Sequence, residues 1–188
     1  MKAIFFDRDG TLVEQVSGYL LDEAQVSLIS GVPMALKTLS KMGYKLFIVT
    51  NQGAIAKDLI TEERVREINR YILQSFKRKG VEFHGLKYCP HHPLGRIQAL
   101  TRECECRKPR PGMLLELANM FGIDLDQSWM VGDNLTDVTA GKQVGCRTTL
   151  VLTGHGKNFE VKARGYAEWI CKDVRDFARR LIQDGVNP

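Results

Sequence analysis

The sequence AIFFDRDGT, residues 3–11, joins a short apolar run to an acidic turn. Its first residues, 3–6, are bulky and apolar, which is typical of a strand buried on both faces of a parallel sheet. Asp7 and Asp9 follow directly, and Gly10 marks a turn. We therefore expect a buried strand that ends in carboxylates at the edge of the sheet where open α/β folds bind their ligands.

Apolar runs of this kind alternate with helical periodicity along the rest of the chain. Further strands are predicted at 45–49, 85–89, 128–131, 148–152 and 168–170. Helices are predicted at 32–42, 61–79, 112–120, 135–144 and 174–182. This alternation predicts an α/β fold: a Rossmann-like, mainly parallel sheet with helices on both faces. We find no repeat or linker, so one domain is expected over 1–188.

The composition is that of an ordinary globular protein. Of the 188 residues, 44% are hydrophobic and 26% charged, which excludes a disordered chain. The formal net charge of +5 comes from dispersed lysines and arginines, a pattern that does not indicate nucleic-acid binding. No run approaches the roughly 18 apolar residues of a membrane span, and the first residues do not resemble a signal peptide. We expect a cytoplasmic protein whose five cysteines are thiols or metal ligands rather than disulfides.

Polar side chains follow several predicted strands at the point where each strand ends. Asp7 and Asp9 follow the first, Thr50 and Asn51 the second, and Asp133 a later one. The carboxyl ends of parallel strands meet at one edge of a sheet, so these side chains are expected to converge. Carboxylate oxygens suit a hard cation, and at cellular concentrations that cation is magnesium. We predict a magnesium site built from Asp7, Asp9 and Asp133.

A second group of candidate ligands lies in the segment 89–111, which lacks helical or strand periodicity. It holds four of the six prolines, three of the five cysteines and two of the four histidines. A loop of this length needs something to order it. Three thiolates and one imidazole make the closed tetrahedral set of a structural zinc site. The candidate ligands are Cys89, Cys104, Cys106 and either His91 or His92.

Four motifs, taken in order, resemble those of the haloacid dehalogenase-like phosphohydrolases. They are Asp7-Arg8-Asp9-Gly10-Thr11, Thr50-Asn51, Lys108-Pro109, and Val131-Gly132-Asp133 followed by Asp137. The resemblance spans nearly the whole chain. It implies a magnesium-dependent enzyme that hydrolyses phosphoric monoesters.

The chemistry of phosphoryl transfer fits the residues in these motifs. Asp7 is suited to attack phosphorus and form an aspartyl-phosphate. Asp9, two residues on, is expected on the same face of an extended segment, where it can protonate the leaving oxygen and later deprotonate water. Thr50 offers a hydroxyl group and Lys108 a positive charge to the transferring phosphoryl group.

The loop residues resemble one small clade of this family. Tyr88-Cys89-Pro90-His91-His92-Pro93 and Cys104-Glu105-Cys106-Arg107-Lys108-Pro109 are similar to segments of the phosphatases of D-glycero-D-manno-heptose 1,7-bisphosphate and of histidinol phosphate. There a zinc loop takes the place of a large cap domain, and the resemblance implies His91 as the fourth zinc ligand. The implied substrate-binding residues are Ser17, Gly18, Tyr19, Thr50, Asn51, Gln52, Gly53, Arg107, Lys108 and Asn134, with main-chain amides near Asn51 and Gln52 donating to phosphate.

Two positions depart from the pattern of the clade. Gly53 lacks the hydroxyl group that the clade usually carries after its Asn-Gln pair, and Asn134 replaces a residue that is commonly basic. Both changes remove a polar contact expected near the phosphate site.

The activity implied by the resemblance is hydrolysis of the C7 phosphate of the heptose bisphosphate, in the synthesis of nucleotide-activated heptose for lipopolysaccharide or other surface polysaccharide. Histidinol phosphate is the alternative substrate, although Arg107 suits its amine and imidazole poorly. A polynucleotide 3′-phosphatase shares the first motif, but the chain lacks interleaved aromatic and basic residues to grip a strand. A zinc-stabilised binding protein is a further class. We expect a monomer that acts on a small phosphorylated sugar, without nucleic-acid or membrane partners.

Overall fold

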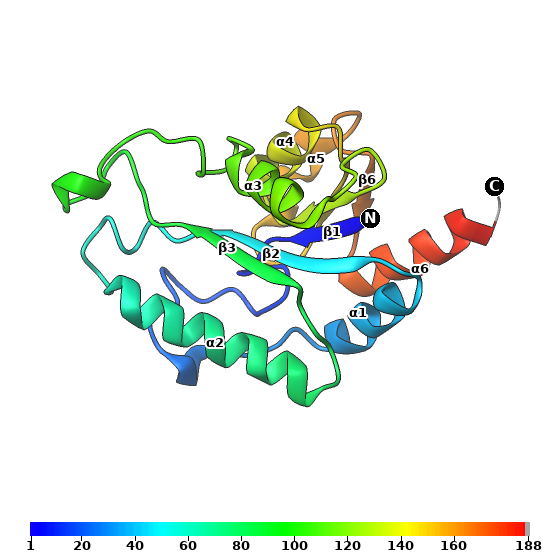
Figure 1. Cartoon of the computed structure of the whole chain (residues 1–188), viewed down its shortest axis with the longest axis horizontal. Helices are drawn as coiled ribbons and strands as arrows, with labels where there is room; N and C mark the ends of the chain where they lie inside the picture. Colours follow the sequence, from blue (N-terminus) through cyan, green and yellow to red (C-terminus); the bar gives the residue numbers. More distant parts are fainter. Residues whose placement is uncertain (187–188) are drawn as a thin grey trace.

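The computed structural model of the chain describes residues 1–186 and contains a parallel six-stranded sheet (Figure 1). The strands lie in the order β3-β2-β1-β4-β5-β6, and every neighbouring pair is parallel. Their bounds are β1 Ala3–Phe6, β2 Lys45–Asn51, β3 Gly85–Cys89, β4 Trp129–Gly132, β5 Arg147–Val151 and β6 Trp169–Cys171. The predicted Rossmann-like α/β class is therefore confirmed.

Helices cover both faces of this sheet (Figure 1). They are α1 Val32–Lys41, α2 Glu62–Arg78, α3 Gly112–Phe121, α4 Leu135–Gln143, α5 Glu160–Ala163 and α6 Val174–Val186. Alternate residues of β1 supply the two core layers: Ile4 and Phe6 pack with α1, α2 and α6, and Phe5 packs with α3. The bulky run that starts the chain is thus apolar throughout because both of its faces are buried.

The predicted elements agree with the observed ones to within a few residues. Thr61 caps α2, where its hydroxyl oxygen accepts a hydrogen bond from the main chain of Arg64 at 3.2 Å. The last helix continues beyond the predicted end at residue 182 to Val186. The 3-10 turn Gly156–Phe159 and the short α5 were not predicted, because a helix of four residues is too short to show a period.

The order of the strands brings the predicted polar positions together. The chain moves from β1 outward through β2 to β3, and then crosses to β4 on the other side of β1. Ligands of open α/β sheets bind at such a switch point, beyond the carboxyl ends of the strands. The main-chain N–H of Asp7 donates to the carbonyl of Val131 at 2.9 Å, which places Asp7 beside the end of β4.

The segment between β3 and α3 runs beyond the carboxyl end of β3 as a long loop (Figure 1). Its one short helical element is a 3-10 turn, Gln98–Leu100. Hydrogen bonds from the main-chain N–H groups of Arg96 and Ile97 to the carbonyl of Ala56, at 2.6 and 3.0 Å, tie it to the segment that follows β2. In residues 1–186 no helix is both long and apolar enough to cross a membrane.

The core beneath α1 generates a stability prediction. Leu36 is fully buried in the layer between α1 and the sheet, whereas Met34 on the same helix is 67% exposed. Leu36→Ala should lower the free energy of unfolding by about 2–5 kcal/mol, and the matched Met34→Ala should change it by less than about 0.5 kcal/mol. Urea titration followed by far-UV circular dichroism measures both, and equal losses would contradict the assigned packing.

Candidate active site

Three carboxylates converge at the switch point of the sheet. Asp7 follows β1, Asp133 follows β4, and Asp137 lies in the first turn of α4. Their oxygens lie within 4.8 Å of one another, and all three residues are buried. They line a cleft of about 290 Å³. The sequence predicts Asp7 and Asp133 here, and it indicates Asp137 only as part of the last motif; the start of α4 directly after Asp133 brings Asp137 to the same place.

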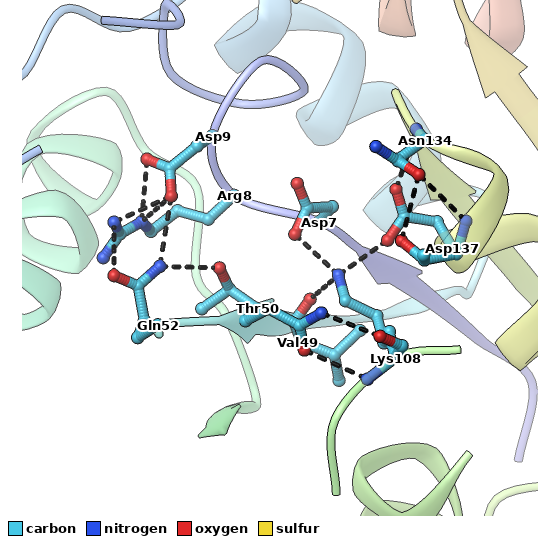
Figure 2. Close-up of polar contacts among 11 residues, drawn as sticks. Asp7, Arg8, Asp9, Val49, Thr50, Gln52, Lys108, Asn134 and Asp137 are labelled. Atoms are coloured by element: carbon cyan, nitrogen blue, oxygen red, sulfur yellow. Dashed lines mark hydrogen bonds and ion pairs between the residues drawn. The ribbon is translucent and has the colours of Figure 1, made fainter. Parts of the chain in front are cut away.

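Lys108 lies between two of these carboxylates (Figure 2). Its buried ammonium group contacts Asp7 Oδ1 at 2.6 Å and Asp137 Oδ1 at 2.7 Å, and donates to the carbonyl of Val49 at 2.7 Å. Asn51 fixes the main chain of Lys108 from both sides, since its Nδ2 donates to the Lys108 carbonyl and its Oδ1 accepts from the Lys108 N–H, both at 3.0 Å. The side chain of Asn51, predicted to bind substrate, is therefore used to position Lys108.

The charge balance of the cluster favours a cation. Burial raises the pKa of Asp7 to about 7; Lys108 opposes this shift, and Asp137 and Asp9 add to it. Burial likewise raises the pKa of Asp133 to about 8, with Asp7 and Asp137 adding to the rise. Burial alone would lower the pKa of Lys108, but Asp137 and Asp7 outweigh it, so this pKa is raised and the ammonium stays charged. One ammonium faces three carboxylates, and the remaining negative charge suits a hard divalent cation.

The main chain packs closely around the carboxylate of Asp133, which is buried. Asp133 Oδ2 accepts a hydrogen bond from the main-chain N–H of His155 at 2.7 Å. A Cβ atom at Gly10 or at Gly154 would lie 2.3 or 2.2 Å from the same oxygen, and both glycines have positive φ angles. His155 was not predicted, because a main-chain donor leaves no signature in the sequence.

The carboxylate of Asp9 does not join the cluster (Figure 2). It accepts a hydrogen bond from Arg8 Nη2 at 2.8 Å and another from Gln52 Nε2 at 3.1 Å. The carboxylates of Asp7 and Asp9 have different partners, because β1 ends at Phe6 and the chain then turns toward Gly10, whose φ is +77°. Asp9 still lines the cleft, with a quarter of its side chain exposed.

The end of β2 and the residues that follow it lie at the cleft. Thr50 is buried, and its hydroxyl oxygen accepts from Gln52 Nε2 at 2.9 Å. The main-chain N–H of Gln52 donates to the carbonyl of Cys89 at 2.8 Å, so this amide, expected to bind phosphate, is already paired. Gly53 lies close to the loop: a Cβ there would be 2.8 Å from His92 Cδ2 and 3.3 Å from Arg107 Nη1. The side chains of His92 and Arg107 therefore occupy the space that a hydroxyl-bearing side chain at position 53 would need.

The remaining predicted contact residues lie at the rim. Gly18, Tyr19 and Arg107 line the cleft, while Ser17 is exposed on the neighbouring loop. Asn134 also lines it, but its side chain caps α4 and accepts from the main-chain N–H of Thr136 at 3.1 Å. The lining residues that were not predicted, besides Asp137 and His155, are Gln15, Val16, Leu20 and Thr136.

The loop brings its candidate zinc ligands into one cluster, made of Cys89, His91, Cys104 and Cys106. The three sulfur atoms lie 3.1–3.5 Å apart, and His91 Nδ1 is 3.3 Å from the sulfur of Cys106. These distances are near the roughly 3.7 Å edge of a tetrahedron of thiolates around one zinc ion. His92 lies outside, where its Nδ1 accepts from the N–H of Leu94 at 3.0 Å. The donor set fits zinc, with His91 in place of His92.

The raised pKa values make cation binding dependent on pH. Asp7 and Asp133 bind more protons in the folded than in the unfolded chain, so they lower the stability of the metal-free protein as pH rises from about 4 to about 8. Magnesium ions should therefore raise the melting temperature more at pH 8, where the cluster is ionised, than at pH 6, where protons compete. Thermal unfolding of protein transferred into magnesium-free buffer measures this. Asp133→Asn should remove most of the difference, and equal magnesium effects at both pH values would contradict it.

Comparisons with known proteins agree with this site. A family model described as HAD-hydrolase-like matches residues 105–177. D-glycero-β-D-manno-heptose-1,7-bisphosphate 7-phosphatase of Yersinia pestis is 37% identical over 95% of this chain and 94% of its own length, and that of Vibrio cholerae is 38% identical over 96% of both. A crystal structure of D,D-heptose 1,7-bisphosphate phosphatase from B. bronchiseptica, complexed with magnesium and phosphate, superposes with a TM-score of 0.87 at 28% identity, over 98% of this chain and 99% of that one. The chain therefore belongs to the heptose-1,7-bisphosphate 7-phosphatase family of haloacid dehalogenase-like phosphatases.

Proposed function

We propose that this phosphatase hydrolyses the C7 phosphate of D-glycero-D-manno-heptose 1,7-bisphosphate, through an aspartyl-phosphate, in the synthesis of nucleotide-activated heptose for a bacterial surface polysaccharide. The observation that carries the proposal is the buried contact of Lys108 with Asp7 and Asp137 beside Asp133, in a chain whose relatives bear this enzyme's name. Those names specify the β anomer, and we extend that preference to this chain.

The nucleophile in this proposal is Asp7. Its carboxylate oxygen forms a bond to phosphorus while the bond from phosphorus to O7 of the sugar breaks, and Asp9 delivers a proton to O7. A water molecule then attacks the aspartyl-phosphate, Asp9 accepts a proton from that water, and the bond between phosphorus and Asp7 breaks to release phosphate. Asp9 borders the cleft while its carboxylate accepts hydrogen bonds from Arg8 and Gln52.

The surrounding charges stabilise the transferring group. Lys108 and the hydroxyl of Thr50 are placed beside Asp7 to interact with phosphate oxygens, and Lys108 keeps its charge through the carboxylates around it. Asp7 and Asp133, with Asp137 adjacent, would hold magnesium, which supplies Lewis-acid activation and offsets the repulsion between an anionic nucleophile and an anionic substrate.

The cysteine cluster serves this site by ordering the loop that carries its cations. We assign it a structural zinc ion, held by Cys89, His91, Cys104 and Cys106. Arg107 follows the last ligand directly, and its Nη1 donates to the carbonyl of His91 at 3.0 Å. A fixed loop holds two cations, Arg107 and Lys108, at the cleft with little loss of entropy on substrate binding.

The cleft favours a phosphorylated sugar over the other substrates considered. Arg107 at the rim suits a second phosphate and disfavours the positively charged end of histidinol phosphate. The named relatives also support the heptose substrate rather than histidinol phosphate. The functional groups come from one sheet, its loops and the first turn of α4, which supports the proposal of one phosphatase domain over 1–188.

Phosphate release tests the substrate assignment. With magnesium present, we expect the β anomer of heptose 1,7-bisphosphate to be hydrolysed with a higher kcat/KM than the α anomer, and both more efficiently than histidinol phosphate. Asp7→Asn should lower the rate by more than about 10³-fold, since the nucleophile is removed, and it serves as the blank. A preference for histidinol phosphate would contradict the assignment.

Loss of the metal cluster should disorder the loop and weaken catalysis. Cys106→Ser is expected to lower the zinc content measured by mass spectrometry and to reduce kcat/KM by about 10- to 100-fold. Cys146→Ala is the matched control, because Cys146 is buried in the core outside the cluster. Full activity in a variant that has lost its zinc would show that the loop is ordered without the metal.

A further inference from the structure

Arg8 lies between the two aspartates of the first motif, and the mechanism above gives it no role. The residue is 1% exposed, and its guanidinium is turned toward Asp9 and Gln52 rather than toward Asp7 (Figure 2). A buried guanidinium is costly unless its donors are paired. The partners of Arg8 therefore indicate what it does.

Every nitrogen of the guanidinium has a partner. Nε donates to both carboxylate oxygens of Asp9 at 3.1 Å, and Nη2 donates to Asp9 Oδ2 at 2.8 Å and to Gln52 Oε1 at 3.1 Å. Nη1 donates to Asn69 Oδ1 at 2.7 Å. Arg8 thus connects Asp9, at the cleft, to α2 on one face of the sheet.

Asn69 is an unusual residue for its position. It lies on the buried stripe of α2 with Val65, Ile68 and Ile72, and it is 4% exposed. Its Oδ1 accepts the bond from Arg8, whereas its Nδ2 has no hydrogen-bond partner within the part of the chain that the structure describes. A buried amide with unpaired donors lowers stability relative to an apolar residue. The hydrogen bond that its Oδ1 accepts from Arg8 is the interaction that an apolar residue at this position could not make.

We infer that Asn69 and Arg8 are positioning residues that set the orientation of Asp9 for proton transfer. Asn69 holds the guanidinium from α2, and the guanidinium with Gln52 holds the Asp9 carboxylate in one defined place at the wall of the cleft. Proton transfer depends on the placement of the acid to a fraction of an ångström. The inference rests on the proposed role of Asp9 as general acid and base.

Substrates whose leaving groups differ in basicity can test this role of Asn69 and Arg8. The sugar oxygen released from a heptose phosphate is strongly basic and needs a proton as its bond to phosphorus breaks. A p-nitrophenolate leaves as a stable anion without one. Misplacement of Asp9 should therefore slow the first step with the sugar phosphate and spare it with p-nitrophenyl phosphate, whereas general damage to the site would slow both.

The test uses Asn69→Leu, which removes the acceptor while keeping similar volume, in the full-length protein loaded with zinc and magnesium. The single-turnover rate of leaving-group release should fall about tenfold with the β anomer of heptose 1,7-bisphosphate and change less than about twofold with p-nitrophenyl phosphate. In separate steady-state measurements, KM should be unchanged. Ile72→Val, a buried change on the same helix, controls for loss of stability, and Asn69→Ala replaces the leucine variant if the latter does not fold.

Asp9→Asn separates this inference from the proposed function. Asp9→Asn should show a larger loss with the same dependence on the leaving group, and adding Asn69→Leu to it should cause no further loss, because Asn69 acts through Asp9. If Asp9→Asn spared the sugar phosphate, the proposed acid role would fail. Equal slowing of both substrates by Asn69→Leu, no slowing of either, or an undiminished effect in the Asp9→Asn background would overturn the positioning role alone.

Discussion

The ammonium group of Lys108 is buried between Asp7 and Asp137, and the geometry of the cleft depends on this contact. Without the lysine the converging carboxylates would repel one another, and without the carboxylates the lysine would be an uncompensated buried charge. The partners come from different parts of the chain: Asp7 follows β1 and Asp137 lies on α4, whereas Lys108 lies in the long loop after β3. The loop therefore has to be held in place for the site to exist.

Besides its main-chain hydrogen bonds to Ala56, the loop has two side-chain anchors close to Lys108. Asn51 at the end of β2 pairs with the main chain of Lys108 in both directions, and the cysteine cluster closes the loop onto Cys89 at the end of β3. Both anchors lie at the carboxyl edge of the sheet, where the substrate has to bind. Side-chain hydrogen bonds and metal ligands fix direction as well as distance, which burial of apolar area does not. These anchors hold Lys108 and Arg107 at the cleft.

The first motif places two aspartates in different environments although only Arg8 separates them. Asp7 faces Lys108 in the buried cluster, and Asp9 faces the guanidinium of Arg8 at the wall of the cleft. A nucleophile has to be held beside phosphorus, whereas a general acid and base has to be held where it reaches the leaving oxygen and then the attacking water. The separate surroundings of Asp7 and Asp9 match these two roles. Asn69 on α2, which accepts a hydrogen bond from Arg8, links the surroundings of Asp9 to the core.

The order and type of the main elements, and most of the residues around the cleft, can be predicted from the amino-acid sequence. Bulky runs such as 3–6 and the spaced apolar residues of 61–79 identify strands and helices because local periodicity reflects burial, and the polar residues after them fall at the carboxyl edge in any parallel sheet. The choice of His91 rests on resemblance and not on spacing, since His92 offers the same imidazole. Other contacts have no local pattern and are seen only in the folded chain. They are the hydrogen bonds of Asp9 with Arg8, of Asn51 with Lys108, of the Gln52 N–H with the Cys89 carbonyl, and of the His155 N–H with Asp133. Each of these contacts depends on a turn of the chain or on a main-chain atom. The positions of turns and main-chain atoms are set by the packing of the whole chain, so the identity of neighbouring residues does not reveal them.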